Sequence, residues 1–236
     1  MAETSLGGAN REWLTTLWTM ILSTRSTTPE ERRRALDQLV RLYWKPVYWF
    51  VRRKGEAVES AKDLTQAFFA DFLERDSLAQ VSKERGRFRS YVRASLEHFL
   101  ANEFDRRAAE KRGGRATTLS LDFASAEAEM AREPSLPPDR AFERKWAVEV
   151  LHRALSRLEG EQHRDYPVLK QHLDLEGKAS YKELAEKLGI SETDVTNALH
   201  RARRRLMEVV ADEVRGSVAD PRDVADEVRE LFKALG

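Results

Sequence analysis

The hydrophobic and polar positions along this chain repeat with the period of an α-helix through nearly its whole length. Apolar residues recur three and four positions apart in long stretches, and the few glycines and prolines separate these stretches. Runs that alternate β-branched and polar residues, the pattern of a strand, are absent. The sequence therefore predicts an all-α protein. Helices are expected at Ser60–Arg75, Arg87–Lys111, Arg140–Leu158, Tyr166–Leu175 and Tyr181–Leu188, from Glu192 through Leu206, and through Val224–Phe232 near the end.

A long helical run is also expected near the start of the chain. Thr28 is suited to cap it, and Pro29 fits the first helical position, where a missing N–H costs nothing. Pro46 is expected to break or kink this run, because proline removes a backbone hydrogen bond inside a helix. Gly55 should end it.

The segment Tyr181–Leu206 has the spacing of a helix-turn-helix. Gly189 tolerates the left-handed backbone that a sharp turn needs, and Ile190 is expected to fill the corner. Ser191 is a good N-cap, and Asp194 three residues later can close a capping box. The apolar face of the first helix is expected to carry Tyr181, Leu184, Ala185 and Leu188.

The second helix of this segment has an apolar face and a polar, basic face. Its inner face is expected to hold Val195, Ala198, Leu199, Ala202 and Leu206. Short polar side chains near its start are suited to base edges in a major groove, and the arginines behind them to phosphates. A solvated basic surface helix is the alternative, but the turn glycine and cap at matching positions favour DNA. The predicted DNA-facing residues are Thr193, Thr196, Asn197, His200, Arg201, Arg203, Arg204 and Arg205.

Composition changes divide the chain into segments. Residues 116–139 are rich in Ser, Ala, Glu and Pro, which is typical of a flexible linker. The sequence thus predicts an amphipathic N-terminal segment at 1–28, a first domain at 29–115, this linker, a helix-turn-helix domain at 140–216 and a C-terminal tail at 217–236. The tail offers one short amphipathic helix, which is expected either to pack on the first domain or to regulate.

The positive charge is local. The 236 residues carry 41 Lys and Arg against 40 Asp and Glu, a net charge of +1. Between Lys83 and Arg115, however, ten basic residues face five acidic ones, a net of +5, and four arginines without an acid lie between Thr196 and Met207. Two basic zones predict two contacts with nucleic acid.

Several function classes have no support in the sequence. There are no cysteines, so disulfides and thiolate zinc sites are excluded. The five histidines form no H-E-x-x-H pair, and neither a phosphate-binding glycine loop nor a Gly-x-Ser-x-Gly elbow occurs. We therefore expect no enzyme, cofactor or metal. The start of the chain lacks the basic and apolar regions of a signal peptide and no run spans a bilayer, so a cytoplasmic protein without membrane contact is expected.

Three stretches together carry a family resemblance: SAKDLTQAFFADFLERD, ERGRFRSYVRASLEHFLANEFDRRAAEKRGG and YKELAEKLGISETDVTNALHRARRRL. Their combination, from Pro29 to Val214, resembles a bacterial RNA polymerase sigma factor of the extracytoplasmic-function group. The resemblance implies a factor that directs promoter-specific transcription initiation, with RNA polymerase core and promoter DNA as partners. In that family the first domain binds the polymerase clamp and opens the minus-ten element, and the second binds the minus-thirty-five element.

The resemblance also implies roles for residues of the first domain. The family's polymerase-binding helix matches Asp63, Leu64, Gln66 and Phe69. Its minus-ten melting and reading stretch matches Phe88, Arg89, Tyr91, Arg93, Asn102, Arg106 and Arg107. Aromatic and arginine side chains suit unpaired bases, which stack on them. Core packing is the competing interpretation for Phe88, Phe99 and Phe104, and it is the favoured one for Phe99 and Phe104.

The chain departs from the commonest family pattern at two places. Lys62 precedes Asp63 where many members carry further acids, which weakens one acidic patch. A serine/threonine kinase acting on Ser60 or Thr65 would restore negative charge there, and an anti-sigma protein is another possible regulator. Thr196 and Asn197 replace the basic or small residues of many relatives, so other promoter bases are expected to be read. A stand-alone helix-turn-helix regulator, which would bind duplex DNA tightly by itself, remains the alternative function.

Overall fold

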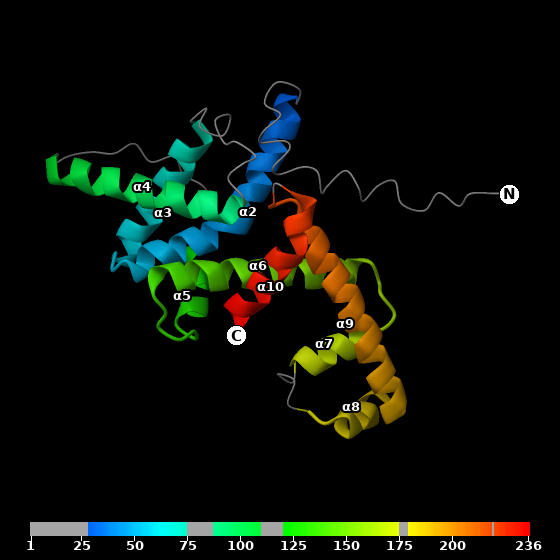
Figure 1. Ribbon diagram of the computed structural model, residues 1–236. Coiled ribbons are helices and arrows are strands. Elements are labelled where there is room, and N and C mark those ends of the chain that lie inside the picture. The colour runs from blue at the N-terminus through cyan, green and yellow to red at the C-terminus, as the bar shows by residue number, and fades with distance from the viewer. Residues whose placement is uncertain (1–27, 75–86, 110–119, 175–178, 219) are drawn as a thin grey trace. The chain divides into compact units, whose positions relative to one another are not determined.

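The computed structural model describes residues 28–74, 87–109, 120–174, 179–218 and 220–236. The predicted N-terminal amphipathic segment lies outside these residues except for Thr28. The described residues form helices, with one isolated antiparallel bridge between Arg87 and Val218, so the all-α class is confirmed. The helices are α2 Pro29–Arg53, α3 Val58–Glu74, α4 Phe88–Ala109, α5 Phe123–Met130, α6 Pro138–Gly160, α7 Tyr166–Asp174, α8 Tyr181–Leu188, α9 Glu192–Arg215, the short 3₁₀ helix η3 Pro221–Asp223, and α10 Val224–Leu235 (Figure 1).

The chain divides into two compact units. Unit 1 contains residues 1–149 and 214–236, and unit 2 contains residues 150–213. Both boundaries fall inside helices, because Glu149 and Val150 belong to α6, and Glu213 and Val214 belong to α9. Unit 2 is therefore an insertion between two parts of unit 1.

The core of unit 1 is rich in aromatic side chains. The Tyr43 ring of α2 lies 5.6 Å from Phe88 of α4 and 6.4 Å from Phe142 of α6, and Phe68 of α3 lies 5.7 Å from Phe99 of α4. Edge-to-face and stacked contacts of this kind add specific attraction to the burial of large apolar surfaces. The core packing expected for Phe99 is confirmed by its burial, whereas Phe104 is exposed, so the packing expected there is wrong.

α2 runs through the proline that was expected to interrupt it. Residues on both sides of Pro46 are helical, so the helix is not broken there, and the ribbon of α2 changes direction along its length, in keeping with the kink that was the other alternative (Figure 1). The residues around Pro46 are buried. Burial of Tyr43, Val47 and Phe50 holds this segment in place and offsets the local cost of proline.

The segment predicted as a flexible linker contains a packed helix. Phe123 of α5 lies 5.5 Å from the Trp44 ring and 4.9 Å from the Tyr48 ring, both on α2. Two ion pairs fix the same helix pair: Lys45–Glu129 at 2.6 Å and Arg52–Glu127 at 2.7 Å. The structure thus differs from the linker expected at 116–139, because the Ala- and Glu-rich composition here supports an amphipathic helix whose partner lies far away in sequence.

The C-terminal residues are part of unit 1. Val228 and Leu231 of α10 are buried, and Arg144 of α6 donates a hydrogen bond to the Leu235 carbonyl. Of the two roles expected for the tail, the structure shows packing on the first unit.

Unit 2 has a small core of its own. Apolar residues of α8 and α9 meet residues of α6 and α7 there, and the buried members are Leu158, Val168, Leu169, Leu184, Ala185, Val195, Ala198, Leu199 and Ala202. Small alanines on both α8 and α9 allow the two helices to approach closely, as a helix-turn-helix requires. This core fixes which face of α9 is left outside.

Candidate nucleic-acid interface

The turn between α8 and α9 has the predicted geometry. Gly189 adopts φ 67° and ψ 33°, in the left-handed region, and ends α8. At the start of α9, the Asp194 N–H donates to the Ser191 hydroxyl at 3.0 Å, and the Ser191 N–H donates to the Asp194 carboxylate at 3.3 Å. The expected capping box is therefore confirmed.

A second capping box was not predicted from the sequence. The Glu183 N–H donates to the Ser180 hydroxyl at 3.2 Å, and the Ser180 N–H donates to the Glu183 carboxylate at 2.7 Å. The Ser180 N–H and the Ser180 hydroxyl both donate to the Glu183 carboxylate and lower its pKa. The Ser-x-x-Glu spacing at 180–183 was the available signal. Both helices of the motif thus begin at satisfied N-termini.

The expected apolar faces are mostly confirmed. Val195, Ala198, Leu199 and Ala202 are buried, and Leu206 is half-buried. Ile190 is 37% exposed, so the expectation that it fills the corner is wrong; Leu184 and Ala185 supply the buried contacts there instead. Tyr181 is also partly exposed, and its ring lies 6.5 Å from His172 of α7.

The first two turns of α9 present polar side chains to the outside. Thr193, Thr196, Asn197 and His200 are all exposed, as are Arg203 and Arg204 further along. The Thr196 hydroxyl donates to the Glu192 carbonyl at 2.9 Å, which leaves its oxygen free to accept. This face carries donors and acceptors suited to base edges, followed by cations suited to phosphates.

Several arginines of α9 have partners within unit 2. The guanidinium of Arg201 donates twice to the Asp165 carboxylate, at 2.8 and 2.9 Å. These bonds hold the pKa of Asp165 below its usual value despite its burial. Arg205 pairs with Glu161 at 2.8 Å and with Glu208 at 3.0 Å. The positions of these arginines on α9 could not predict their acidic partners, because Glu161 and Asp165 lie in the turn before α7.

Arg203 and Arg204 are the more available cations. Arg203 lies 3.1 Å from the His172 ring nitrogen, and burial together with the Arg203 charge lowers the pKa of His172. Arg204 has no ion pair within the described part of the chain. Of the residues of α9 predicted to face DNA, the exposed ones are thus Thr193, Thr196, Asn197, His200, Arg203 and Arg204.

The residues matched to minus-ten reading lie along α4, in contrasting settings. Phe88 is 1% exposed and packs in the core, and Arg89 is 5% exposed. Tyr91 is half-buried, and Arg93 is half-buried and lies 3.6 Å from Glu143. In this structure Phe88 and Arg89 are not presented to DNA, because the aromatic core and buried carboxylates enclose the first turn of α4.

The later part of α4 is more open. Asn102 is exposed and lies 3.2 Å from the His98 ring nitrogen, and Arg106 is exposed and pairs with Glu103 at 2.7 Å. Arg107 belongs to α4, but its side chain is outside the described residues. The exposed polar face at 98–106 is therefore the part of α4 that is open to a ligand.

The residues matched to polymerase binding divide between two faces of α3. Leu64 and Phe69 are buried, at 1% and 0% exposure, and belong to the core of unit 1. Asp63 is exposed and Gln66 is half-buried. Lys62, the departure from the family pattern, pairs with Glu59 at 2.7 Å. Of the predicted set, only Asp63 is thus exposed on α3.

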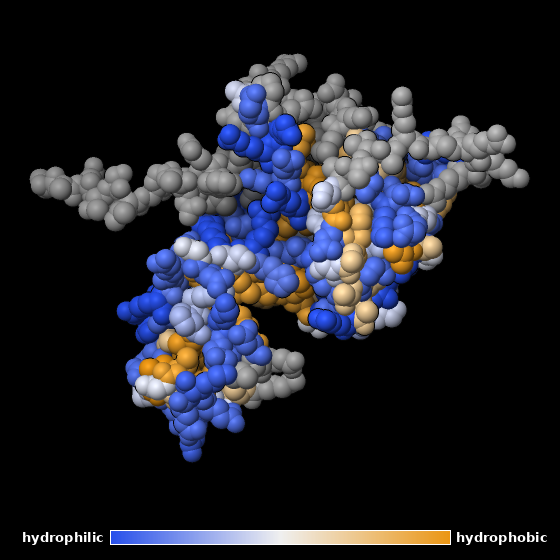
Figure 2. All heavy atoms as spheres, turned by 180° about the vertical axis from the view of Figure 1, so that it is seen from behind, coloured by the Kyte–Doolittle hydropathy of each residue, from blue (hydrophilic) through white to orange (hydrophobic). Residues whose placement is uncertain are grey.

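None of the described residues forms a group of three or more His, Asp or Glu that could hold a metal ion. None of the described helices is both long and apolar enough to span a membrane. Figure 2 shows a largely hydrophilic visible surface on which hydrophobic residues form separate patches.

Comparison with known proteins agrees with this site. Residues 175–206, which include α8 and most of α9, match the family model "Sigma-70, region 4". The chain is also 26% identical over 176 residues to the RNA polymerase sigma factor YlaC of Bacillus subtilis (strain 168), covering 75% of this chain and 92% of that relative. No solved structure matches the chain significantly. With the helix-turn-helix of unit 2 and the resemblance along unit 1, these matches support a sigma factor of RNA polymerase and are consistent with the extracytoplasmic-function group.

Proposed function

We propose that this sigma factor joins RNA polymerase core through the outer face of α3 and selects promoters through the exposed face of α9. One observation supports this proposal: both helices of the helix-turn-helix are capped and packed on a buried core, and the second helix begins with an exposed polar face. Such a face matches the geometry by which a recognition helix enters a major groove.

The upstream promoter contact is assigned to Thr193, Thr196 and Asn197, with Arg203 and Arg204 on phosphates. Asn197 can make two hydrogen bonds to an adenine edge, and threonine offers a hydroxyl and a methyl group. Arg201 donates two hydrogen bonds to the Asp165 carboxylate, so its proposed role is to hold α9 against the turn before α7. This assignment separates base contact, phosphate contact and positioning along one helix.

The polymerase contact is assigned to Asp63 and Gln66. They lie three positions apart on α3, with Asp63 exposed and Gln66 half-buried, while Leu64 and Phe69 anchor the helix in unit 1. Reversing the charge at Asp63 should oppose binding to a basic partner surface, as like charges do across an interface. Asp37, which is exposed on α2, offers a matched control for such a reversal.

The minus-ten contact is assigned first to Asn102 and Arg106, which are exposed on α4. Tyr91 is half-buried, with its ring 5.8 Å from Phe72. We place the protein in the cytoplasm, where its polymerase acts, and propose no catalytic role for it.

Of the two hydroxyls near Asp63 that a kinase was expected to modify, we propose that only Ser60 serves as a regulatory site. Thr65 is fully buried, and its hydroxyl has no hydrogen-bond partner in the described ranges, so a kinase could not reach it without local unfolding. Ser60 is half-buried and donates to the Glu56 carboxylate. A kinase acting at this patch would therefore use Ser60, and an anti-sigma protein would compete for the outer face of α3.

The test is promoter-directed transcription with purified protein and bacterial RNA polymerase core. We expect transcripts with defined starts only when both are present, weak binding of the free protein to duplex DNA, and loss of core binding in Asp63→Arg but not in Asp37→Arg. Tight DNA binding by the free protein, with no effect of core, would instead support a stand-alone regulator. Sequencing the transcript starts would give the promoter preference.

A further inference from the structure

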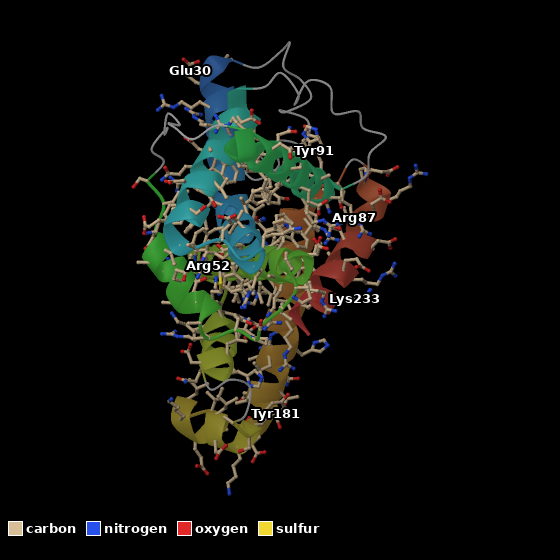
Figure 3. The ribbon with its side chains drawn as sticks, turned by 90° about the vertical axis from the view of Figure 1, so that its left-hand side faces the viewer. Glu30, Arg52, Arg87, Tyr91, Tyr181 and Lys233 are labelled. Atoms are coloured by element: carbon tan, nitrogen blue, oxygen red, sulfur yellow. The ribbon has the colours of Figure 1, made fainter. Side chains whose placement is uncertain are left out.

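The C-terminal segment, defined as residues 217–236, docks on the first turn of α4. The Phe88 N–H donates to the Ser217 carbonyl at 2.8 Å, and Arg87 forms the isolated antiparallel bridge with Val218. Ser217 and Val218 are buried, as are Val228 and Leu231 of α10. Figure 3 shows Arg87 where the start of α4 meets α10. The segment therefore covers the beginning of the helix matched to promoter melting.

A buried carboxylate of this segment holds two arginines at the start of α4. Glu227 is 0% exposed; its oxygens lie 3.0 Å from Arg87 Nε and 2.7 Å from Arg89 Nε. The Arg89 guanidinium also pairs with Glu143 and lies 4.6 Å from the centre of the Trp146 ring. A carboxylate presents two oxygens to guanidinium groups as a phosphate does. Glu227 thus occupies cations of the same basic zone, with its net charge of +5, that predicts a contact with nucleic acid.

The connectivity of the chain adds a second argument. Both ends of unit 2 continue into residues that pack in unit 1, through Glu149 on one side and Val214 on the other. α6 is deeply anchored by Phe142 and Trp146, both at 0% exposure, whereas α10 leaves Phe232 38% exposed. The C-terminal attachment is therefore the one suited to release.

We propose that the C-terminal segment is an intramolecular inhibitor that keeps the first turn of α4 covered in the free protein and is displaced when polymerase and promoter DNA are engaged. The Glu227 carboxylate stands in for DNA phosphate, and its departure exposes Arg87 and Arg89. Release also frees one of the two attachments of unit 2. This inference rests on the proposed function.

The decisive test locks the segment in place. The chain has no cysteine, so Arg87→Cys with Val218→Cys creates a single possible disulfide. Residues opposed in an antiparallel bridge have Cα atoms about 4.5–5.5 Å apart, which is within disulfide reach. We expect the oxidised double variant to give at least about fivefold less promoter-directed transcript than the same protein after reduction, a typical coupling between sites. Equal transcription by both forms would overturn the proposal.

The single variants Arg87→Cys and Val218→Cys are the controls, and they should not respond to oxidation. If wild-type protein with core yields no promoter-directed transcript, the proposed function fails, whatever the disulfide does. If the reduced double variant is inactive, the rate at which a thiol reagent labels the cysteine of the Val218→Cys protein decides whether the segment is released. Faster labelling after addition of core and promoter DNA supports release, and unchanged labelling refutes it.

A charge-neutral variant tests the carboxylate itself. Glu227→Gln removes the charge that holds Arg87 and Arg89, and we expect about fivefold more transcript at limiting protein concentration. Glu230→Gln makes the same change on the same helix at a more exposed site that lies 3.8 Å from Lys233, and it should leave transcription unchanged. Loss of transcription in Glu227→Gln while circular dichroism stays native would show that α10 is a scaffold, and would contradict inhibition.

Discussion

The starts of α4 and α9 both carry residues predicted to contact promoter DNA but bury them to opposite degrees. At the start of α9, Thr193, Thr196 and Asn197 are exposed and the N-terminus is closed by its own capping box. At the start of α4, Phe88 and Arg89 are enclosed and the Phe88 N–H is satisfied by Ser217, from the far end of the chain. Whether the start of α4 is available to DNA is therefore decided by distant residues rather than by the helix itself.

The largest difference in stability between the two helix starts is expected when one side chain is truncated at each of them. Phe88→Ala removes a ring packed against Tyr43 and should lower the free energy of unfolding of unit 1 by about 3–5 kcal/mol. Thr196→Ala should change stability by less than about 0.5 kcal/mol, as exposed substitutions do. Hydrogen exchange can assign each loss of stability to unit 1 or unit 2. Equal losses in the two variants would contradict the difference in burial between the two helix starts.

A smaller effect is expected at the turn before α9. Gly189→Ala places a side chain at φ 67°, which costs about 1–2 kcal/mol, although the added Cβ would meet no atom within 4 Å. Gly160→Ala is the matched control, because its Cβ also has open space and no left-handed backbone is required there. Thermal unfolding should show destabilisation for Gly189→Ala alone.

Acid should weaken unit 2 through Asp165. Hydrogen bonds from Arg201 outweigh burial and lower the pKa of Asp165 from 3.8. A lowered folded-state pKa gives stability that is present above pH 3.8 and is lost as the pH falls further. Arg201→Ala should therefore destabilise unit 2 at neutral pH, and its difference from wild type should shrink below about pH 4. A difference independent of pH would assign another role to Arg201.

Replacing Arg204 is expected to have the smallest effect on stability but a clear effect on promoter binding. Arg204→Ala should leave unfolding unchanged and reduce the salt dependence of promoter binding by about one unit of slope, because one phosphate contact is lost. Arg215→Ala, at the exposed end of α9, is the control on the same helix. An unchanged slope would remove Arg204 from the DNA face.

Local patterns were enough to predict the helix-turn-helix. The bounds of α8, the left-handed Gly189 and the Ser191–Asp194 box follow from residues within four positions of one another. Glu227 and Arg89 are separated by 138 positions, and α5 pairs with α2 across more than 70, so no local period indicates either contact. The family resemblance assigned Leu64 and Phe69 to a partner surface, but both are buried in unit 1.

Because residues 214–236 complete unit 1, the order of synthesis matters for this protein. All of unit 2 is synthesised before the ribosome adds Glu227, so Arg87 and Arg89 must wait for their carboxylate until translation is nearly finished. Unit 2 can form its own core while unit 1 still lacks its last residues. Stalled chains that stop before α10 and carry a spacer long enough to bring α9 out of the ribosomal exit tunnel should therefore show a protected α9 and an unprotected first turn of α4.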